Sequence, residues 1–160
     1  MNALTFPLAA LALALVAAVI DLRTRTIPNA LNWSALVIAV AAHAWLSHGP
    51  GAVAALVCAG IAALPFLPAV LAGGMGGGDL KLALALGALL ANLDQTLTLL
   101  IGTVTSGAAM ALLVAARKGR LRDTLRRLWS KEARRAPGVI IAYGPAFVFG
   151  AAAVVARIWL

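Results

Sequence analysis

Charged residues are scarce in this sequence. Only 11% of the 160 residues are Asp, Glu, Lys or Arg, whereas 63% are hydrophobic and the mean hydropathy is +1.00. A soluble domain normally carries about 25% charged residues. The composition therefore excludes a soluble globular protein and predicts an integral membrane protein with little mass outside the bilayer. We expect one membrane-embedded domain that covers residues 1–160.

Cysteine is nearly absent as well. Cys58 is the only one, which excludes an internal disulfide and a zinc site built from several cysteines. It lies inside an apolar run, where we expect a small buried side chain. The sequence also lacks a His-Glu-x-x-His motif and a serine in a Gly-x-Ser-x-Gly context, two common signatures of hydrolytic sites. We expect neither a metal nor a cofactor.

Long apolar runs predict an all-α, polytopic membrane fold of about six spans. The runs cover residues 4–20, 30–46, 52–72, 79–92, 95–116 and 138–159, and one span needs about 20 residues. A secretory signal needs a basic start, but no basic residue precedes Asp21, so we expect the first run to be a retained span. The fourth run is short, and we expect it to begin in the preceding glycines or to be broken there.

Basic residues occur in alternate loops. Residues 21–29, 73–81 and 117–137 contain Lys or Arg, whereas the loops at 47–51 and 92–95 contain neither. Basic loops of membrane proteins face the cytoplasm. We therefore expect these three loops inside, and both termini outside.

This topology gives two acidic residues the same depth. Asp21 ends the first span and Asp79 begins the fourth, so both are expected at the cytoplasmic face. Depth alone leaves open whether they also meet laterally. Arg157 is the one charge that opposes the topology, and we expect its long side chain to snorkel to the outer interface.

The segment 117–135 carries most of the charge. Nine basic side chains lie there against two acidic ones, so the segment holds +7 of the formal net charge of +8. Four apolar residues recur at helical spacing and predict an amphipathic surface helix: Leu121, Leu125, Leu128 and Trp129. We expect this cytoplasmic loop to bind anionic lipid, with a protein partner as the alternative, and we expect no binding of nucleic acid.

The two aspartates are the candidate catalytic residues. A charge at the centre of a bilayer helix costs roughly 2.5–3.5 kcal/mol, so such residues are functional candidates. Two carboxyl groups at one site share a proton, because like charges a few ångströms apart do not ionise together easily. The ionised group can take a proton from water while the other donates to a scissile carbonyl. Local roles are the alternative: an Asp21–Arg25 ion pair, and Asp79 at a helix N-terminus.

Glycine is concentrated immediately before Asp79. Five of the six residues from 73 to 78 are glycine: Gly73, Gly74, Gly76, Gly77 and Gly78. In a plain helix each costs about 0.8–1 kcal/mol relative to alanine. We therefore expect a bent, accessible segment that admits an extended peptide, with a flexible interhelical loop as the alternative.

Together these motifs resemble the type IV prepilin peptidase family, membrane aspartic peptidases of the Gly-x-Gly-Asp type. The residues that carry the resemblance are Asp21-x-Arg23-x-x-x-Ile27-Pro28-Asn29, Gly76-x-Gly78-Asp79-x-Lys81 and Tyr143-Gly144-Pro145, in this order over nearly the whole chain. The resemblance implies that Asp21 and Asp79 are the catalytic pair. They would remove the short basic leader of pilin precursors at the cytoplasmic face of the bacterial inner membrane, leaving the hydrophobic pilin helix in the membrane.

The resemblance also implies a subtype. Longer family members carry a cytoplasmic domain with paired cysteines and also N-methylate the trimmed pilin. The present sequence has only Cys58, and no such domain fits before Asp21. It resembles the short, peptidase-only form of tight-adherence (Flp) pili, so methyltransferase activity is expected to be absent.

Several residues near these motifs are expected to support the site. Pro28 suits the first turn of the second span. Asn29 and Asn32 place amides near the cytoplasmic entrance, where they could bind a peptide backbone; turn and capping roles are the alternative. For Lys81 and Arg23 we expect contact with substrate or with lipid phosphates, or simple interfacial anchoring.

One further motif lies in the last predicted span. Tyr143-Gly144-Pro145 is expected either to kink the last span and aim the phenol at the site or to serve in ordinary packing.

Two other functions are alternatives to a peptidase. Membrane carboxylates also serve as proton relays, so a small proton-coupled transporter is the main alternative. A non-catalytic pilus-assembly subunit is another. The single, cytoplasmic glycine cluster favours the peptidase.

Overall fold

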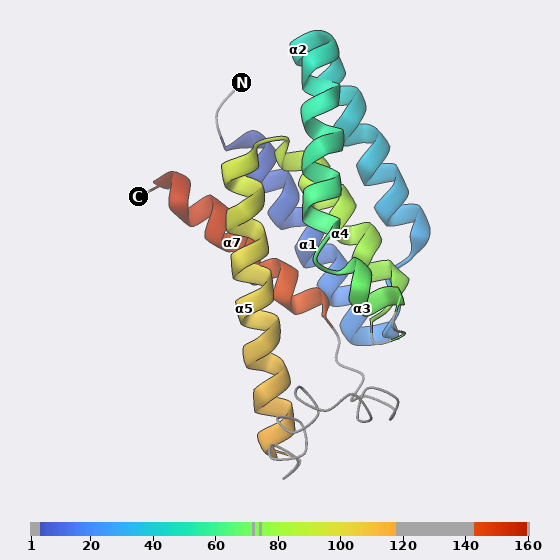
Figure 1. The fold of residues 1–160 in the computed structure, drawn as a ribbon, viewed down its shortest axis with the longest axis vertical. Coiled ribbons are helices and arrows are strands. Elements are labelled where there is room, and N and C mark those ends of the chain that lie inside the picture. Colours follow the sequence, from blue (N-terminus) through green and yellow to red (C-terminus); the bar gives the residue numbers. More distant parts are fainter. Residues whose placement is uncertain (1–3, 72, 74, 118–142, 160) are drawn as a thin grey trace.

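The residues described by the computed structural model form a set of packed helices (Figure 1). The structure describes residues 4–71, 73, 75–117 and 143–159. The helices are α1 (Thr5–Thr24), α2 (Asn29–Ala63), α3 (Leu67–Leu71), α4 (Gly77–Leu90), α5 (Leu93–Arg117) and α7 (Gly144–Trp159). The all-α prediction is confirmed. The predicted amphipathic helix at 117–137 lies outside the described residues, except for Arg117.

Helix α2 is a helical hairpin rather than one straight rod. Figure 1 shows two arms that meet at one end of the molecule. A Cβ on Gly51 would contact the His43 carbonyl, eight residues earlier, which is possible only where the chain reverses. We expected a loop at 47–51, but the backbone stays helical through these residues. Pro50 and Gly51 allow this reversal, because proline breaks regular hydrogen bonding and glycine permits close approach.

The predicted third apolar run, 52–72, is interrupted. Helix α2 ends at Ala63, residues 64–66 form a turn, and the short helix α3 follows. Pro65 lies in that turn and cannot continue the preceding helix, since it lacks an N–H. Pro68 lies in the first turn of α3, where the missing donor costs little.

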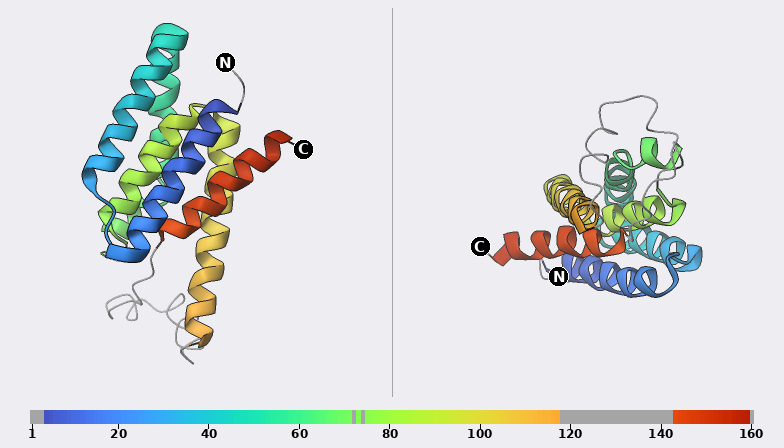
Figure 2. Two further views of the ribbon diagram at one scale, coloured as in Figure 1. Left: turned by 180° about the vertical axis from the view of Figure 1, so that it is seen from behind. Right: turned by 90° about the horizontal axis from the view of Figure 1, so that it is seen from below.

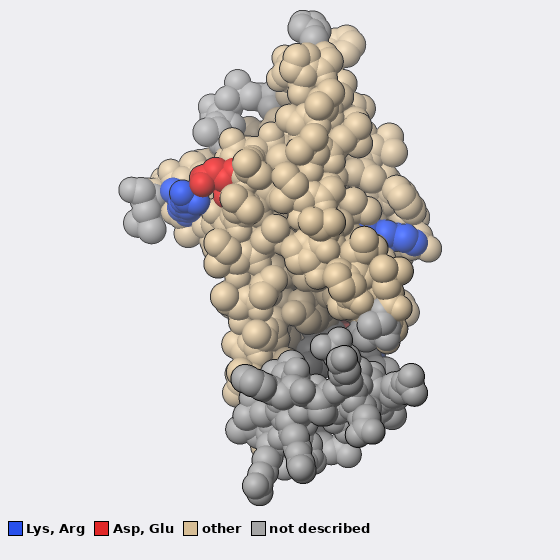
Figure 3. Space-filling model, in the orientation of Figure 1, with Lys and Arg blue, Asp and Glu red and all other residues tan. Residues whose placement is uncertain are grey.

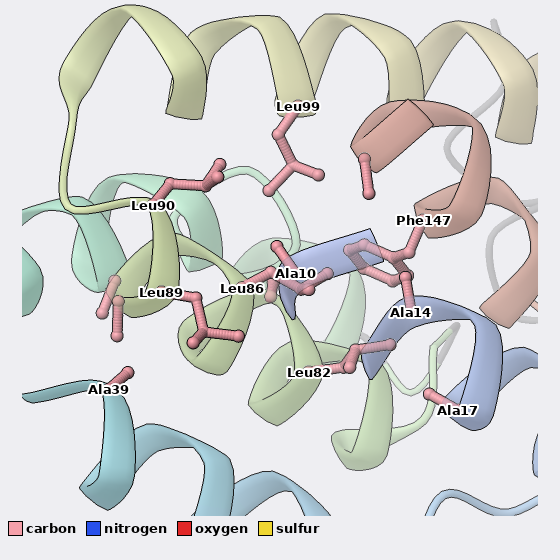
Figure 4. Packing of buried hydrophobic residues seen from close by; sticks show 14 of the residues in the cluster. Ala10, Ala14, Ala17, Ala39, Leu82, Leu86, Leu89, Leu90, Leu99 and Phe147 are labelled. Carbon is pink, nitrogen blue, oxygen red and sulfur yellow. The ribbon is translucent and has the colours of Figure 1, made fainter. Parts of the chain in front are cut away.

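Helix α4 is the centre of the bundle. Its leucines, including Leu82 and Leu86, pack against small residues of α1 such as Ala10 and Ala14 (Figure 4). Gly87 packs so closely on the second arm of α2 that a Cβ there would lie 2.7 Å from Ala62 Cβ. Small residues permit such close helix contact in a membrane, where lipid removes the hydrophobic drive for association.

Helix α7 runs obliquely between α1 and α5 (Figure 2). Its crossing with α5 is built from glycines: a Cβ on Gly102 would lie 2.8 Å from Gly150 Cα. Ser106 Oγ adds a link by donating to the Ala146 carbonyl at 3.2 Å. These contacts fix the start of α7 relative to the rest of the bundle, and this start contributes to the site described below.

Much of the apolar surface faces outward, as a membrane protein requires. Thr5–Thr24, Asn29–Ser47 and Leu93–Arg117 are long and apolar enough to cross a membrane, and only 17–33% of their most apolar windows is buried inside the bundle. Gly49–Ala63 and Gly144–Trp159 are shorter apolar helices. On the face shown in Figure 3, the charged side chains that stand out among the described residues lie toward its margins. Exposed apolar side chains of this density are compatible with lipid rather than water.

Arg157, the charge that opposed the predicted topology, has partners in the structure. Its guanidinium lies 3.1 Å from Asp94 Oδ1 and donates to Thr98 Oγ1 at 2.7 Å, which links α7 to α5. Both charged side chains are exposed. We expect Arg157→Ala to lower the free energy of unfolding by at most about 1 kcal/mol, because exposed ion pairs contribute little. Thermal unfolding in detergent measures this; a loss of several kcal/mol would contradict it.

Candidate active site

Asp21 is a buried carboxylate in the last turn of α1. The negative end of the helix dipole disfavours an anion there. A compensating donor comes from α7: the backbone N–H of Gly144 donates to Asp21 Oδ2 at 2.9 Å. Gly144 is the first residue of its helix, so this N–H has no partner within α7 and lies at the positive end of its dipole. The start of α7 therefore stabilises a charge that α1 alone would disfavour.

Asp79 lies in the first turn of α4, where the helix dipole favours a negative charge. Gly76 precedes the helix in an extended conformation, and the Asp79 N–H donates to its carbonyl at 3.2 Å. A Cβ on Gly76 would lie 3.6 Å from Asp79 Oδ2, so the carboxylate lies over the start of its own helix. This half-buried side chain therefore lies at a helix N-terminus, as the alternative of a local role predicted.

The two carboxylates share one cavity. It has a volume of about 320 Å³ and is lined by Asp21, Arg25, Thr26, Ile27, Asn29, Gly76, Gly77, Gly78 and Asp79. Small-molecule sites in proteins have cavities of roughly 300–1,000 Å³, so a few peptide atoms fit. Among the described residues, no Lys or Arg nitrogen lies within 4.0 Å of either carboxylate. The alternative of a local Asp21–Arg25 ion pair is therefore wrong.

The first turn of α2 is tied to the first turn of α4. Lys81 Nζ donates to Asn29 Oδ1 at 2.7 Å, and Asn32 Nδ2 donates to the Gly78 carbonyl at 3.0 Å. Gly78 also packs on Ile27, since a Cβ there would lie 3.3 Å from Ile27 Cβ. These contacts hold the segment before Asp79 against the segment that follows Asp21.

The structure brings most of the predicted site residues together. Six of them line the cavity: Asp21, Asn29, Gly76, Gly77, Gly78 and Asp79. Lys81 and Gly144 do not line it, but each donates a hydrogen bond to a residue that does, Lys81 to Asn29 and Gly144 to Asp21. Pro28 immediately precedes α2 instead of lying in its first turn. Arg23 is exposed on the last turn of α1 and does not line the cavity.

For the last predicted motif, the expected kink is wrong and the alternative of ordinary packing matches the structure. Gly144 begins α7 and Pro145 follows in its first turn, so the motif starts a helix instead of kinking one. The hydroxyl of Tyr143 lies where Gly107 of α5 has no Cβ, and the ring packs edge-on against Phe66 and Phe147. The phenol is thus held by α5 and does not line the cavity.

Three cavity residues were not among the predicted site residues: Arg25, Thr26 and Ile27. Arg25 was considered only as an ion-pair partner of Asp21, and Ile27 only as part of the first motif. Arg25 caps α1 in a left-handed conformation (φ 54°), which costs a non-glycine residue about 1–2 kcal/mol. This turn directs the following two residues along the cavity wall. Their place in the sequence could have identified them. If Asp21 and Asn29 both line the site, the residues between them must pass close to it.

The arrangement suits acid–base chemistry on water. Two carboxyl groups line one small cavity, and no Lys or Arg nitrogen of the described residues lies within 4.0 Å of either. This is a setting in which a pair shares a proton. Within residues 4–71, 73, 75–117 and 143–159, no three His, Cys, Asp or Glu side chains come together as metal ligands.

Comparison with known proteins adds one match. A profile of the Type IV leader peptidase family matches residues 8–112, which includes both aspartates and the glycine run. No curated protein and no solved structure matches the chain.

Proposed function

The chain belongs to the type IV leader peptidase family, and we propose that Asp21 and Asp79 are its catalytic pair, activating water to remove the leader of type IV prepilins. Family membership implies prepilin peptidase activity. The observation that supports these two residues is their shared cavity, formed by helix ends that are 58 residues apart in the sequence.

The proposed reaction needs only the two carboxyl groups and water. The ionised carboxylate takes a proton from water, whose oxygen bonds to the scissile carbonyl carbon, while the neutral carboxyl donates its proton to the carbonyl oxygen. In the resulting tetrahedral intermediate the C–N bond breaks as its nitrogen is protonated, and a carboxylic acid and an amine form. The shared proton belongs to the pair, so neither residue is assigned as acid or base.

The proposed orientation follows from the basic loops. α1, the two arms of α2, α4, α5 and α7 would make six spans, with the cavity at the cytoplasmic face of the inner membrane. A pilin precursor would keep its apolar helix in the bilayer and present its basic leader to the cavity from the cytoplasm. The basic segment 117–135 would bind anionic lipid.

A cleavage assay tests this function. Purified protein in detergent is incubated with a full-length pilin precursor, and the products are measured by mass spectrometry. We expect the precursor to be shortened at one bond just before its apolar helix. A precursor that stays intact with folded enzyme would contradict the peptidase and favour the proton-coupled transporter or the assembly subunit.

We further propose that the protein is the peptidase-only form of the tight-adherence type. The single cysteine, Cys58, is buried in α2 and has no second cysteine to pair with in this sequence. With S-adenosylmethionine carrying a labelled methyl group, we expect cleaved pilin without label. Labelled mature pilin would contradict the prediction, and the amount of cleaved product in the same sample is the control.

A further inference from the structure

Asn32 is a buried amide whose position does not fit the substrate-binding role expected for it. The side chain is 1% exposed, in the first turn of α2, and does not line the cavity. Its Nδ2 donates to the Gly78 carbonyl at 3.0 Å, across 46 residues of sequence. The amide is therefore already used within the protein.

The hydrogen bond reaches the peptide that carries Asp79. The Gly78 carbonyl and the Asp79 N–H belong to one planar unit, so a donor to this carbonyl restrains the peptide plane from which Asp79 and its side chain extend. No side chain caps this end of α4, and Gly76 and Gly77 leave the preceding backbone unusually free. The donor from α2 adds to the other restraints on this turn, which are the Lys81–Asn29 hydrogen bond and the packing of Gly78 on Ile27.

Asn32 is a poor choice for stability alone. Its Oδ1 is buried and has no hydrogen-bond partner among the described residues. An unsatisfied buried acceptor costs about 1–3 kcal/mol, whereas an apolar residue of similar shape avoids this cost. The reversed amide would place its oxygen against the Gly78 oxygen, so the orientation of the amide is fixed by the bond it makes.

We propose that Asn32 is a positioning residue of the peptidase, which holds the Gly78–Asp79 peptide so that the Asp79 carboxyl faces Asp21 across the cavity. This inference rests on the proposed function and deepens it. Asn32 acts through the backbone of α4 and contacts neither water nor substrate.

Asn32→Leu separates this role from a structural one. The substitution keeps the number and branching of the side-chain heavy atoms, removes the buried acceptor and deletes the hydrogen bond to Gly78. We expect the unfolding temperature to stay within a few degrees or rise. The kcat should fall by about 10- to 100-fold, because a displacement of about 1 Å in a catalytic group has effects of this size. The KM should change little, since Asn32 does not contact the substrate.

Ser34→Ala is the matched control. Ser34 is on the same helix turn, is exposed and donates only to the Leu31 carbonyl of its own helix. We expect wild-type kcat and KM. A wild-type kcat for Asn32→Leu would overturn the proposal, as would a raised KM at unchanged kcat, which would show substrate binding instead.

Asn32→Asp provides a rescue. A neutral carboxyl can donate to the Gly78 carbonyl and an ionised one cannot. Its kcat relative to wild type at the same pH should therefore rise as the pH falls, and the ratio for Asn32→Leu should stay flat. Among the described residues, the charged groups around this part of the site are Asp21, Arg25, Asp79 and Lys81. Dividing by the wild-type rate at each pH removes their own titration. Parallel ratios for both variants would overturn the proposal. Failure of the wild-type protein to cleave would instead refute the proposed function, so the two failures are distinguishable.

Discussion

Asp79→Asn and Asp21→Asn are each expected to abolish leader removal while the protein still inserts and folds. Asparagine has the shape of aspartate but cannot take up or release the shared proton. General acid–base catalysis contributes about 10²–10⁴-fold, and the remaining carboxyl group has no partner to share a proton with. We therefore expect cleavage of a pilin precursor to fall by at least about 10²-fold in either variant, measured as kcat/KM with purified protein.

Asp94→Asn is the control for this loss. Asp94 begins α5, is exposed, and pairs with Arg157 away from the cavity. The same chemical change there should leave kcat/KM within about twofold, because an exposed ion pair contributes little. Wild-type cleavage by both active-site variants would refute the catalytic pair. An equal loss in all three variants would show that the assay reports folding instead of chemistry.

The sequence predicts the helices better than their connections. Apolar runs locate α1, α4 and α5 to within a few residues, because a segment that contacts lipid must be apolar over nearly its whole length. The predicted loop at 47–51 was correct in position and wrong in kind: the chain reverses there, but its backbone stays helical despite the loop-forming Gly and Pro. Pro65 indicated that the helix should end near it, but we predicted a continuous run over 52–72 because the residues around Pro65 are apolar.

The sequence predicted that the two aspartates lie close to each other in depth, but not the details of the site. Charge alternation predicts one membrane level for Asp21 and Asp79, which is compatible with their shared cavity, and the glycines lie at the start of α4. Their lateral meeting depends on how α1, α2 and α4 pack, which a single sequence does not show. The bonds that complete the site join residues far apart: Gly144 to Asp21, and Asn32 to Gly78. In both bonds a backbone group is one partner, so residue type alone gives no indication of it.

Gly144→Ala is expected to inactivate the enzyme by moving Asp21. A Cβ on Gly144 would lie 2.9 Å from Ala18 Cα and 3.0 Å from both Cβ and Oδ2 of Asp21. Ala18 Cα belongs to the backbone of α1 and cannot rotate away, so α7 must shift or the carboxylate must turn. Either movement breaks the 2.9 Å bond from the Gly144 N–H. We expect kcat to fall by about 10²-fold, with a loss of about 1–3 kcal/mol in stability from overpacking.

Gly60→Ala is the matched control, because it adds the same methyl group in α2, where nothing lies within 4 Å of the new Cβ. Its kcat should equal that of the wild type, and alanine should slightly stabilise the helix. The loss of kcat in Gly144→Ala should persist well below its unfolding temperature, since the cause is the geometry of Asp21 and not the unfolded fraction. Full activity at low temperature would show that the close contact between α7 and α1 is dispensable. In that case the Gly144 N–H would not be what holds the Asp21 carboxylate in place for catalysis.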